Sequence, residues 1–138
     1  MDKVMNYLSL ARKAGLAELG EEPVGAAARA LTAALIVVAS DASDHTWRRA
    51  KSFAAGTDQQ TVRLPHTKDE MGMAIGRSSL AIAAITDPAL ALSMVQAIGE
   101  PEKHQAVLEV LEKKTARVRK RQAEAKAHKR NVRMGKKK

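Results

Sequence analysis

The sequence predicts an α/β fold in which one sheet lies between two layers of helices. Helix-like and strand-like segments alternate along the first 100 residues. The two best strand candidates, residues 33–39 and 80–85, are apolar on both faces, which is typical of strands covered on both sides. Helices packed on each face would provide that cover. A chain of 138 residues without cysteine can bury such a core without disulfides or metal staples.

The expected elements follow in chain order from periodicity and from turn residues. They are a helix over 2–13, at most a short strand over 16–19, a helix from 20 to about 31, a strand over 33–39, a helix over 44–54, a strand over 61–64, a short helix from 67 to 76, a strand over 80–85 and a helix from 87 to 99. Glycines at positions 15, 76 and 99 are the expected ends of three of these helices.

Capping patterns indicate where several helices begin. Gly20-Glu21-Glu22-Pro23 places acids and an early proline in a first turn. Thr67-Lys68-Asp69-Glu70 has the spacing of a capping box. Asp87-Pro88 combines a cap with a first-turn proline, and Ser40-Asp41-Ala42-Ser43 is a polar turn with two candidate caps. Trp47 falls on the apolar face of the helix over 44–54, so we expect it to pack in the core rather than against a base.

The chain changes character after residue 100. Residues 1–100 carry 10 Lys and Arg against 11 Asp and Glu, whereas residues 101–138 carry 14 against 4. We therefore divide the chain into a domain over 1–100 and a basic C-terminal segment over 101–138. The apolar residues between 107 and 111 suit one more amphipathic helix. From residue 113 onwards too little apolar surface remains to offset the ordering entropy, so we expect this part to be mobile when free.

The basic segment indicates a polyanionic partner. Residues 113–138 hold 13 Lys and Arg and a single acid, a composition that attracts nucleic-acid phosphates. The cations expected to contact RNA are Lys113, Lys114, Arg117, Arg119, Lys120 and Arg121. A membrane partner is not expected, because the segment has no lipid-facing apolar stripe and no apolar run approaches the roughly 20 residues of a span.

No residue pattern indicates an enzyme. His45, His66, His104 and His128 lack metal-ligand spacing, and we expect them at the surface. A glycine-rich phosphate loop and a nucleophile elbow are both missing from the sequence. We therefore expect no catalytic residue, no metal and no cofactor. One Phe, one Tyr and one Trp also argue against a base-stacking sheet. The first residues lack the basic and then apolar run of a secretory signal, so we expect a cytoplasmic protein.

Several short motifs occur in a definite order over about residues 4–98. They are Leu10-Ala11-Arg12-Lys13-Ala14-Gly15, Gly20-Glu21-Glu22, Ser40-Asp41-Ala42-Ser43, Thr67-Lys68-Asp69-Glu70-Met71-Gly72, Ala74-Ile75-Gly76-Arg77 and Ala84-Ile85-Thr86-Asp87. In order and spacing, this set resembles the kink-turn-binding ribosomal protein superfamily, the archaeal "seven-Ae" and eukaryotic "thirty-e" type, and especially its bacterial ribosomal-protein-like branch. The resemblance implies an α/β/α sandwich around a four-stranded mixed sheet.

The resemblance also implies an RNA surface made of three segments, residues 20–29, 40–46 and 76–80. The residues it assigns to RNA binding are Gly20, Glu21, Glu22, Arg29, Asp41, Ser43, Gly76, Arg77, Ser78 and Ser79. Where the family usually presents Asn, Glu and Lys to the sheared G·A pairs of a kink-turn, this chain has Glu22, Pro23 and Ala26, with Arg29 one turn further on as a substitute cation. The implied partner is a ribosomal or other structured RNA, bound by a monomer, with ribosomal proteins as further candidate partners.

Two alternatives to an RNA-binding protein stay open. Some relatives on this fold, the growth-arrest and DNA-damage-inducible group, act mainly through protein partners. The chain could accordingly be a protein-interaction module whose tail binds nucleic acid without specificity. The other alternative is a histone-like DNA binder or membrane-surface binder that depends on the tail alone.

Overall fold

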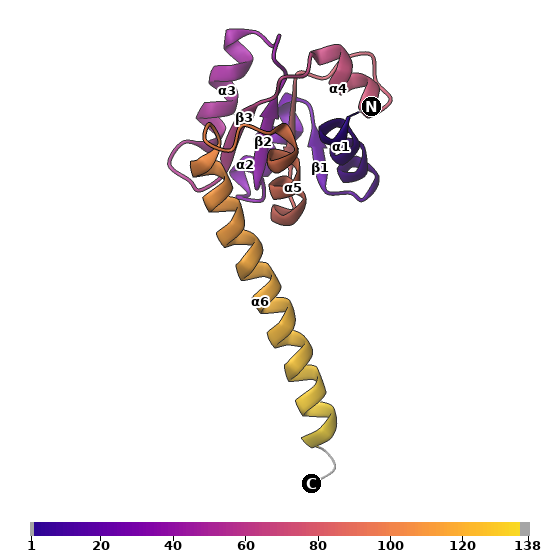
Figure 1. Ribbon diagram of the computed structural model, residues 1–138, viewed down its shortest axis with the longest axis vertical. Coiled ribbons are helices and arrows are strands. Elements are labelled where there is room, and N and C mark those ends of the chain that lie inside the picture. The colour runs from indigo at the N-terminus through magenta and orange to yellow at the C-terminus, as the bar shows by residue number, and fades with distance from the viewer. Residues whose placement is uncertain (1, 136–138) are drawn as a thin grey trace.

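The computed structural model describes residues 2–135, and the side chains of residues 2–129, and it confirms the predicted α/β class (Figure 1). The helices are α1 (Lys3–Lys13), α2 (Glu21–Arg29), α3 (Asp44–Ala54), α4 (Lys68–Ala74), α5 (Pro88–Ile98) and α6 (Gln105–Gly135). The strands are β1 (Ala17–Leu19), β2 (Leu35–Val38), β3 (Gln60–Arg63) and β4 (Ile82–Ile85). Each predicted helix and strand is present, with ends that shift by a few residues.

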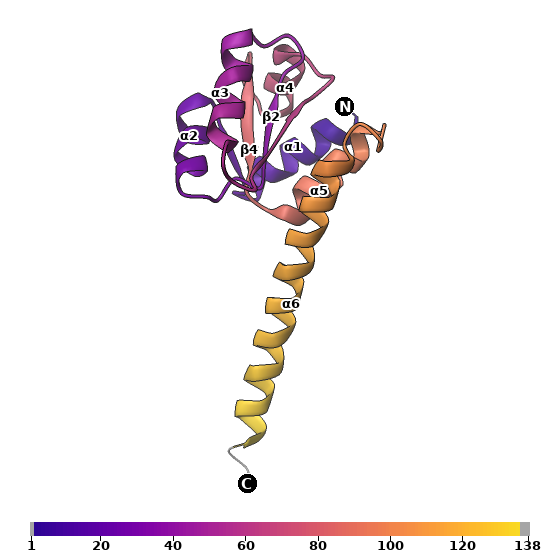
Figure 2. The same cartoon turned by 90° about the vertical axis from the view of Figure 1, so that its left-hand side faces the viewer.

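The four strands form one mixed sheet in the order β1-β4-β2-β3. Strand β4 is antiparallel to both of its neighbours, and β2 is parallel to β3. Figure 2 shows α2 and α3 on one side of the sheet, with α1, α5 and α6 on the other. The three-layer sandwich around a four-stranded mixed sheet is therefore confirmed.

The central strands β2 and β4 are buried along their whole length and contribute side chains to both layers. Leu35 and Val37 join the core beneath α1, α4, α5 and α6. Ile36 and Val38 join the smaller core beneath α2 and α3. This alternation is the two-residue repeat of a strand, and it explains why the run over 33–39 contains no polar residue.

Side-chain caps hold four of the helices at their N-termini. Asp2, Ser43 and Asp87 each accept a hydrogen bond from the backbone N–H three residues later, at 3.0, 3.2 and 2.8 Å. Thr67 and Glu70 form the complete predicted capping box. Helix α2, by contrast, begins at Gly20 with no side-chain cap.

Helix α6 continues well beyond the amphipathic stretch that the sequence predicts. It runs to Gly135, with no proline or glycine interrupting it before that residue, and Ala, Lys, Arg, Glu and Gln are all good helix formers. Its first turns pack against the domain, where Leu111 is completely buried and Thr115 donates a 2.7 Å hydrogen bond to the Leu111 carbonyl. Beyond that contact the helix projects away from the domain (Figure 1). The mobility of the free segment stays a prediction.

The surface position predicted for His66 is wrong. Its side chain is buried, and its Nε2 atom lies 2.5 Å from the Asp2 carboxylate. Hydrogen bonds from the Met5 backbone N–H and from His66 lower the pKa of Asp2. The sequence gives no hint of this pair, because its members are 64 residues apart and meet only when α1 packs beside the β3–α4 connection.

Candidate nucleic-acid interface

The sheet topology brings the three candidate RNA-binding segments to one edge. The Gly20 N–H donates to the Ile82 carbonyl at 3.0 Å, and the Ala39 N–H donates to the Ala81 carbonyl at 2.9 Å. The start of α2 thus lies on one side of the start of β4, and the turn after β2 lies on the other side. The loop over 76–80 comes just before β4 in the chain and therefore lies at the same edge. We call this edge, formed by residues 20–29, 40–46 and 76–80, the glycine edge.

The first turn of α2 is the most open helix start on the glycine edge. Gly20 has φ +95°, a conformation that favours glycine, and it provides no side chain to cap the turn. The first backbone N–H groups of α2 therefore have no side-chain acceptor. Uncapped N–H groups at the positive end of a helix attract phosphate or other acceptors.

The two acids of this turn have different surroundings. Glu21 is half-buried and accepts a 2.5 Å hydrogen bond from the Arg49 Nε atom of α3. Glu22 is exposed. Both line a shallow cavity of about 520 Å³ that also contains the exposed Ala26 and Arg29. Arg29 therefore shares one surface with Glu22, as its expected role as a substitute cation requires.

Two of the predicted site residues have structural roles. The Asp41 carboxylate accepts a 2.8 Å hydrogen bond from the Lys68 backbone N–H, which ties the turn after β2 to the start of α4. Ser43 is the N-cap of α3. Both side chains are exposed, but their oxygens already have backbone donors. They therefore hold the shape of the glycine edge.

The loop over 76–80 is held against α4 by a close backbone approach. A Cβ atom at Gly72 would lie 2.6 Å from the Ser79 backbone nitrogen, so only glycine fits at that position. The Arg77 N–H donates to the Gly72 carbonyl at 2.8 Å, and Gly76 has φ +74°. Arg77, Ser78 and Ser79 are exposed on this fixed loop, where their side chains can reach a ligand.

The cations of α6 do not form a uniform tail, and Lys114, Arg117 and Arg121 lie at the opposite end of β2 and β4 from Gly20. Lys114 is largely buried, with a side chain only 17% exposed, and its Nζ atom lies 3.1 Å from the Asp58 carboxylate. The side chains of Lys113, Arg117, Arg119, Lys120 and Arg121 are exposed. Figure 1 shows α6 leaving the domain away from the turn between β2 and α3.

Sequence patterns reveal neither the Glu21–Arg49 contact nor a second cavity beside α6. Glu21 and Arg49 come from different helices, so only the tertiary packing of α2 against α3 brings them together. The second cavity depends on the position of α6, which composition alone does not indicate. Among the described residues, no cluster of three or more His, Asp or Glu side chains could hold a metal ion. No described helix is long and apolar enough to span a membrane.

Comparison with known proteins shows similarity in structure alone. No family model and no curated protein matches the sequence. A Bacillus halodurans protein of unknown function superposes with a TM-score of 0.66 and 22% identity, over 71% of this chain and 98% of that one. The Giardia lamblia 15.5kD RNA binding protein superposes with a TM-score of 0.53 and 19% identity, over 72% of this chain and 84% of its own. These likenesses establish a shared fold.

Proposed function

We propose that the protein binds structured RNA of the kink-turn type through the glycine edge. The observation that carries this proposal is the meeting of three separate segments, each expected to contact RNA, at one edge beside an uncapped helix start. The shared fold with a Giardia RNA binding protein supports the same function.

The glycine edge provides two kinds of contact. The open N–H groups of α2 and the Arg77 side chain bind phosphates and set the position of the RNA. Glu22 is the exposed acceptor that can take a hydrogen bond from a guanine amino group. Base-edge contacts of this kind provide the preference for one RNA structure, whereas the α6 cations add phosphate affinity to any RNA.

The test is a titration of wild type, Glu22→Ala and Ala26→Lys against a kink-turn RNA and a straight duplex of equal length, at one salt concentration. Wild type should prefer the kink-turn. Glu22→Ala should lose about 1–3 kcal/mol of that preference if the carboxylate contacts a base. Ala26→Lys should strengthen kink-turn binding, because it adds a cation on an exposed face beside Arg29.

Equal binding of both RNAs by wild type and by Ala26→Lys would contradict the proposal. A protein-interaction module on the same fold would then be the better hypothesis. Pro23 and Ala26, which offer neither a hydrogen-bonding group nor a charge at the helix start, are the residues that favour this alternative.

A further inference from the structure

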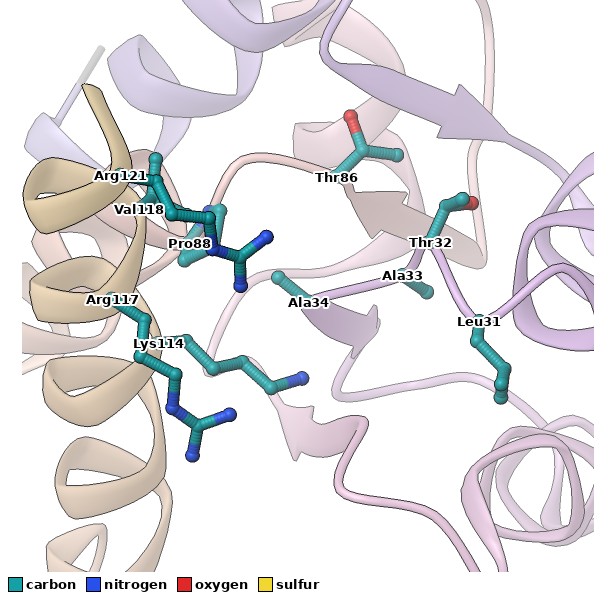
Figure 3. Close-up of a pocket in the computed structure, with 10 residues that line it drawn as sticks. All are labelled: Leu31, Thr32, Ala33, Ala34, Thr86, Pro88, Lys114, Arg117, Val118 and Arg121. Atoms are coloured by element: carbon teal, nitrogen blue, oxygen red, sulfur yellow. The ribbon is translucent and has the colours of Figure 1, made fainter. Parts of the chain in front are cut away.

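A cavity of about 580 Å³ lies at the edge of the sheet opposite the glycine edge. Its walls are α6, the connection between α2 and β2, and the start of α5 (Figure 3). The segment from Ala34 to Ala39 passes from this cavity to the glycine edge, a rise of roughly 16 Å along an extended strand. Sites for organic ligands commonly have volumes of roughly 300–1,000 Å³, so one or two nucleotide units match this space.

The α6 wall of the cavity is cationic. Lys114, Arg117 and Arg121 line it, and none of the lining residues is an acid. Figure 3 shows Lys114 and Arg121 extending from α6 toward the segment that contains Thr32 and Ala34. Lys114 already pairs with Asp58, whereas neither arginine has an ion pair among the described side chains. Two guanidinium groups are thus available for phosphate oxygens, which they bind well in a bidentate manner.

The opposite wall consists of Leu31 and of small residues, and hydrogen bonds hold its backbone in place. The Ala33 N–H donates to the Gln59 side chain at 3.1 Å, and the Gln59 amide donates to the Ala28 carbonyl at 3.1 Å, so a buried glutamine fixes the connection. Leu31 follows α2 with φ +60°, in a position where helices usually have glycine. Leu31 is 67% exposed and lines the cavity. The chain therefore presents a large apolar side chain at the cavity mouth despite an unfavourable backbone conformation.

We propose that this cavity binds a single-stranded segment of RNA. The arginines contact its phosphates, and a base packs against Leu31 and the small residues beside it. A duplex stacks its bases inside, so only splayed, single-stranded bases can enter such a cavity. The inference rests on the proposed RNA binding. It adds a second RNA contact at the edge of the sheet opposite the glycine edge. One protein would thereby hold two segments of the same RNA.

The matched test replaces two arginines inside the cavity or two cations outside it. The variants are Arg117→Gln/Arg121→Gln in the cavity and Arg48→Gln/Lys51→Gln on α3, which remove equal charge from exposed positions. Binding of a fluorescent eight-nucleotide single-stranded RNA is measured by anisotropy at fixed salt. The first variant should weaken binding roughly tenfold by losing two phosphate contacts, whereas the second should stay within about threefold of wild type.

Leu31→Gly separates binding from stability. Glycine accepts the left-handed conformation freely, so the melting temperature should stay within a few degrees of wild type. Affinity for the single strand should fall about threefold or more, because the apolar contact is lost.

Equal losses in the two double variants, unchanged affinity in Leu31→Gly, or no binding of the single strand by wild type would each overturn the cavity proposal. The kink-turn preference is measured separately, through Glu22 and Ala26. It should survive in all the cavity variants, so failure of the cavity and failure of the glycine edge give different results.

Discussion

Gly72 illustrates how one residue without a side chain can shape a candidate RNA surface. It lies in the middle of α4, where glycine weakens a helix, yet the Ser79 backbone occupies the space that a Cβ atom would need. The Gly72 carbonyl also accepts the Arg77 N–H. The close packing of α4 against the loop over 76–80 therefore explains why position 72 is a glycine, although glycine weakens the helix.

We expect Gly72→Ala to push the loop over 76–80 away from α4. The new Cβ atom would lie within 3 Å of three backbone atoms, and such overpacking usually costs about 1–3 kcal/mol of the free energy of unfolding. Thermal melting measures that cost, and an RNA titration measures the loss of kink-turn affinity. Met73→Ala is the control, since the Met73 side chain is 76% exposed on the same helix. Wild-type melting and binding in Gly72→Ala would disprove the role of this contact.

Local residue patterns correctly predict contacts within a few positions and fail for distant ones. The Thr67–Glu70 capping box and the Asp87 cap are visible in the sequence because their partners lie three residues away. The Asp41 contact with Lys68 and the Glu21 contact with Arg49 span 27 and 28 residues, so they depend on the tertiary fold. The candidate site is consequently predictable as segments, while the partners of its side chains are not.

Helix α6 is the element on which sequence and structure differ most. The sequence indicates a short amphipathic helix and then a mobile tail, because the apolar stripe fades and the charge rises. In the structure, one face of α6 packs against the domain through Leu111, Thr115 and Val118. Between residues 112 and 129, Val118 is the only large apolar residue of α6, and Lys114 packs on the same face through its long side chain. One apolar residue per two turns is too weak a periodicity to predict this packing.

Two truncations test how far α6 belongs to the folded domain. A chain ending at residue 104 loses Leu111 and the contacts of Val107 and Leu108 with the main core, which should cost more than about 3 kcal/mol of the free energy of unfolding. A chain ending at residue 121 loses, among the described side chains, only the exposed residues 122–129 of α6, so its stability should stay within about 0.5 kcal/mol of full length. Chemical denaturation measures both. Equal stability of the two truncated chains would show that α6 does not stabilise the domain.

The two ends of the molecule differ in their chemistry. The glycine edge carries two cations, Arg29 and Arg77, whereas α6 carries ten Lys and Arg against three Glu. Residues 119–135 of α6 extend for roughly 26 Å at the rise of an α-helix. Under the function proposed above, one RNA would contact both ends, with base contacts at the glycine edge and phosphate contacts along α6.

The most direct test of this account is an NMR titration of the labelled full-length protein with a kink-turn RNA at physiological salt. We predict that the backbone amide signals of Gly20–Glu22, Ser43 and Gly76–Ser79 shift together with those of α6, because the RNA contacts the glycine edge as well as the cations. Shifts confined to α6, with the signals of the glycine edge unchanged at saturation, would contradict the account. The protein would then bind RNA by charge alone.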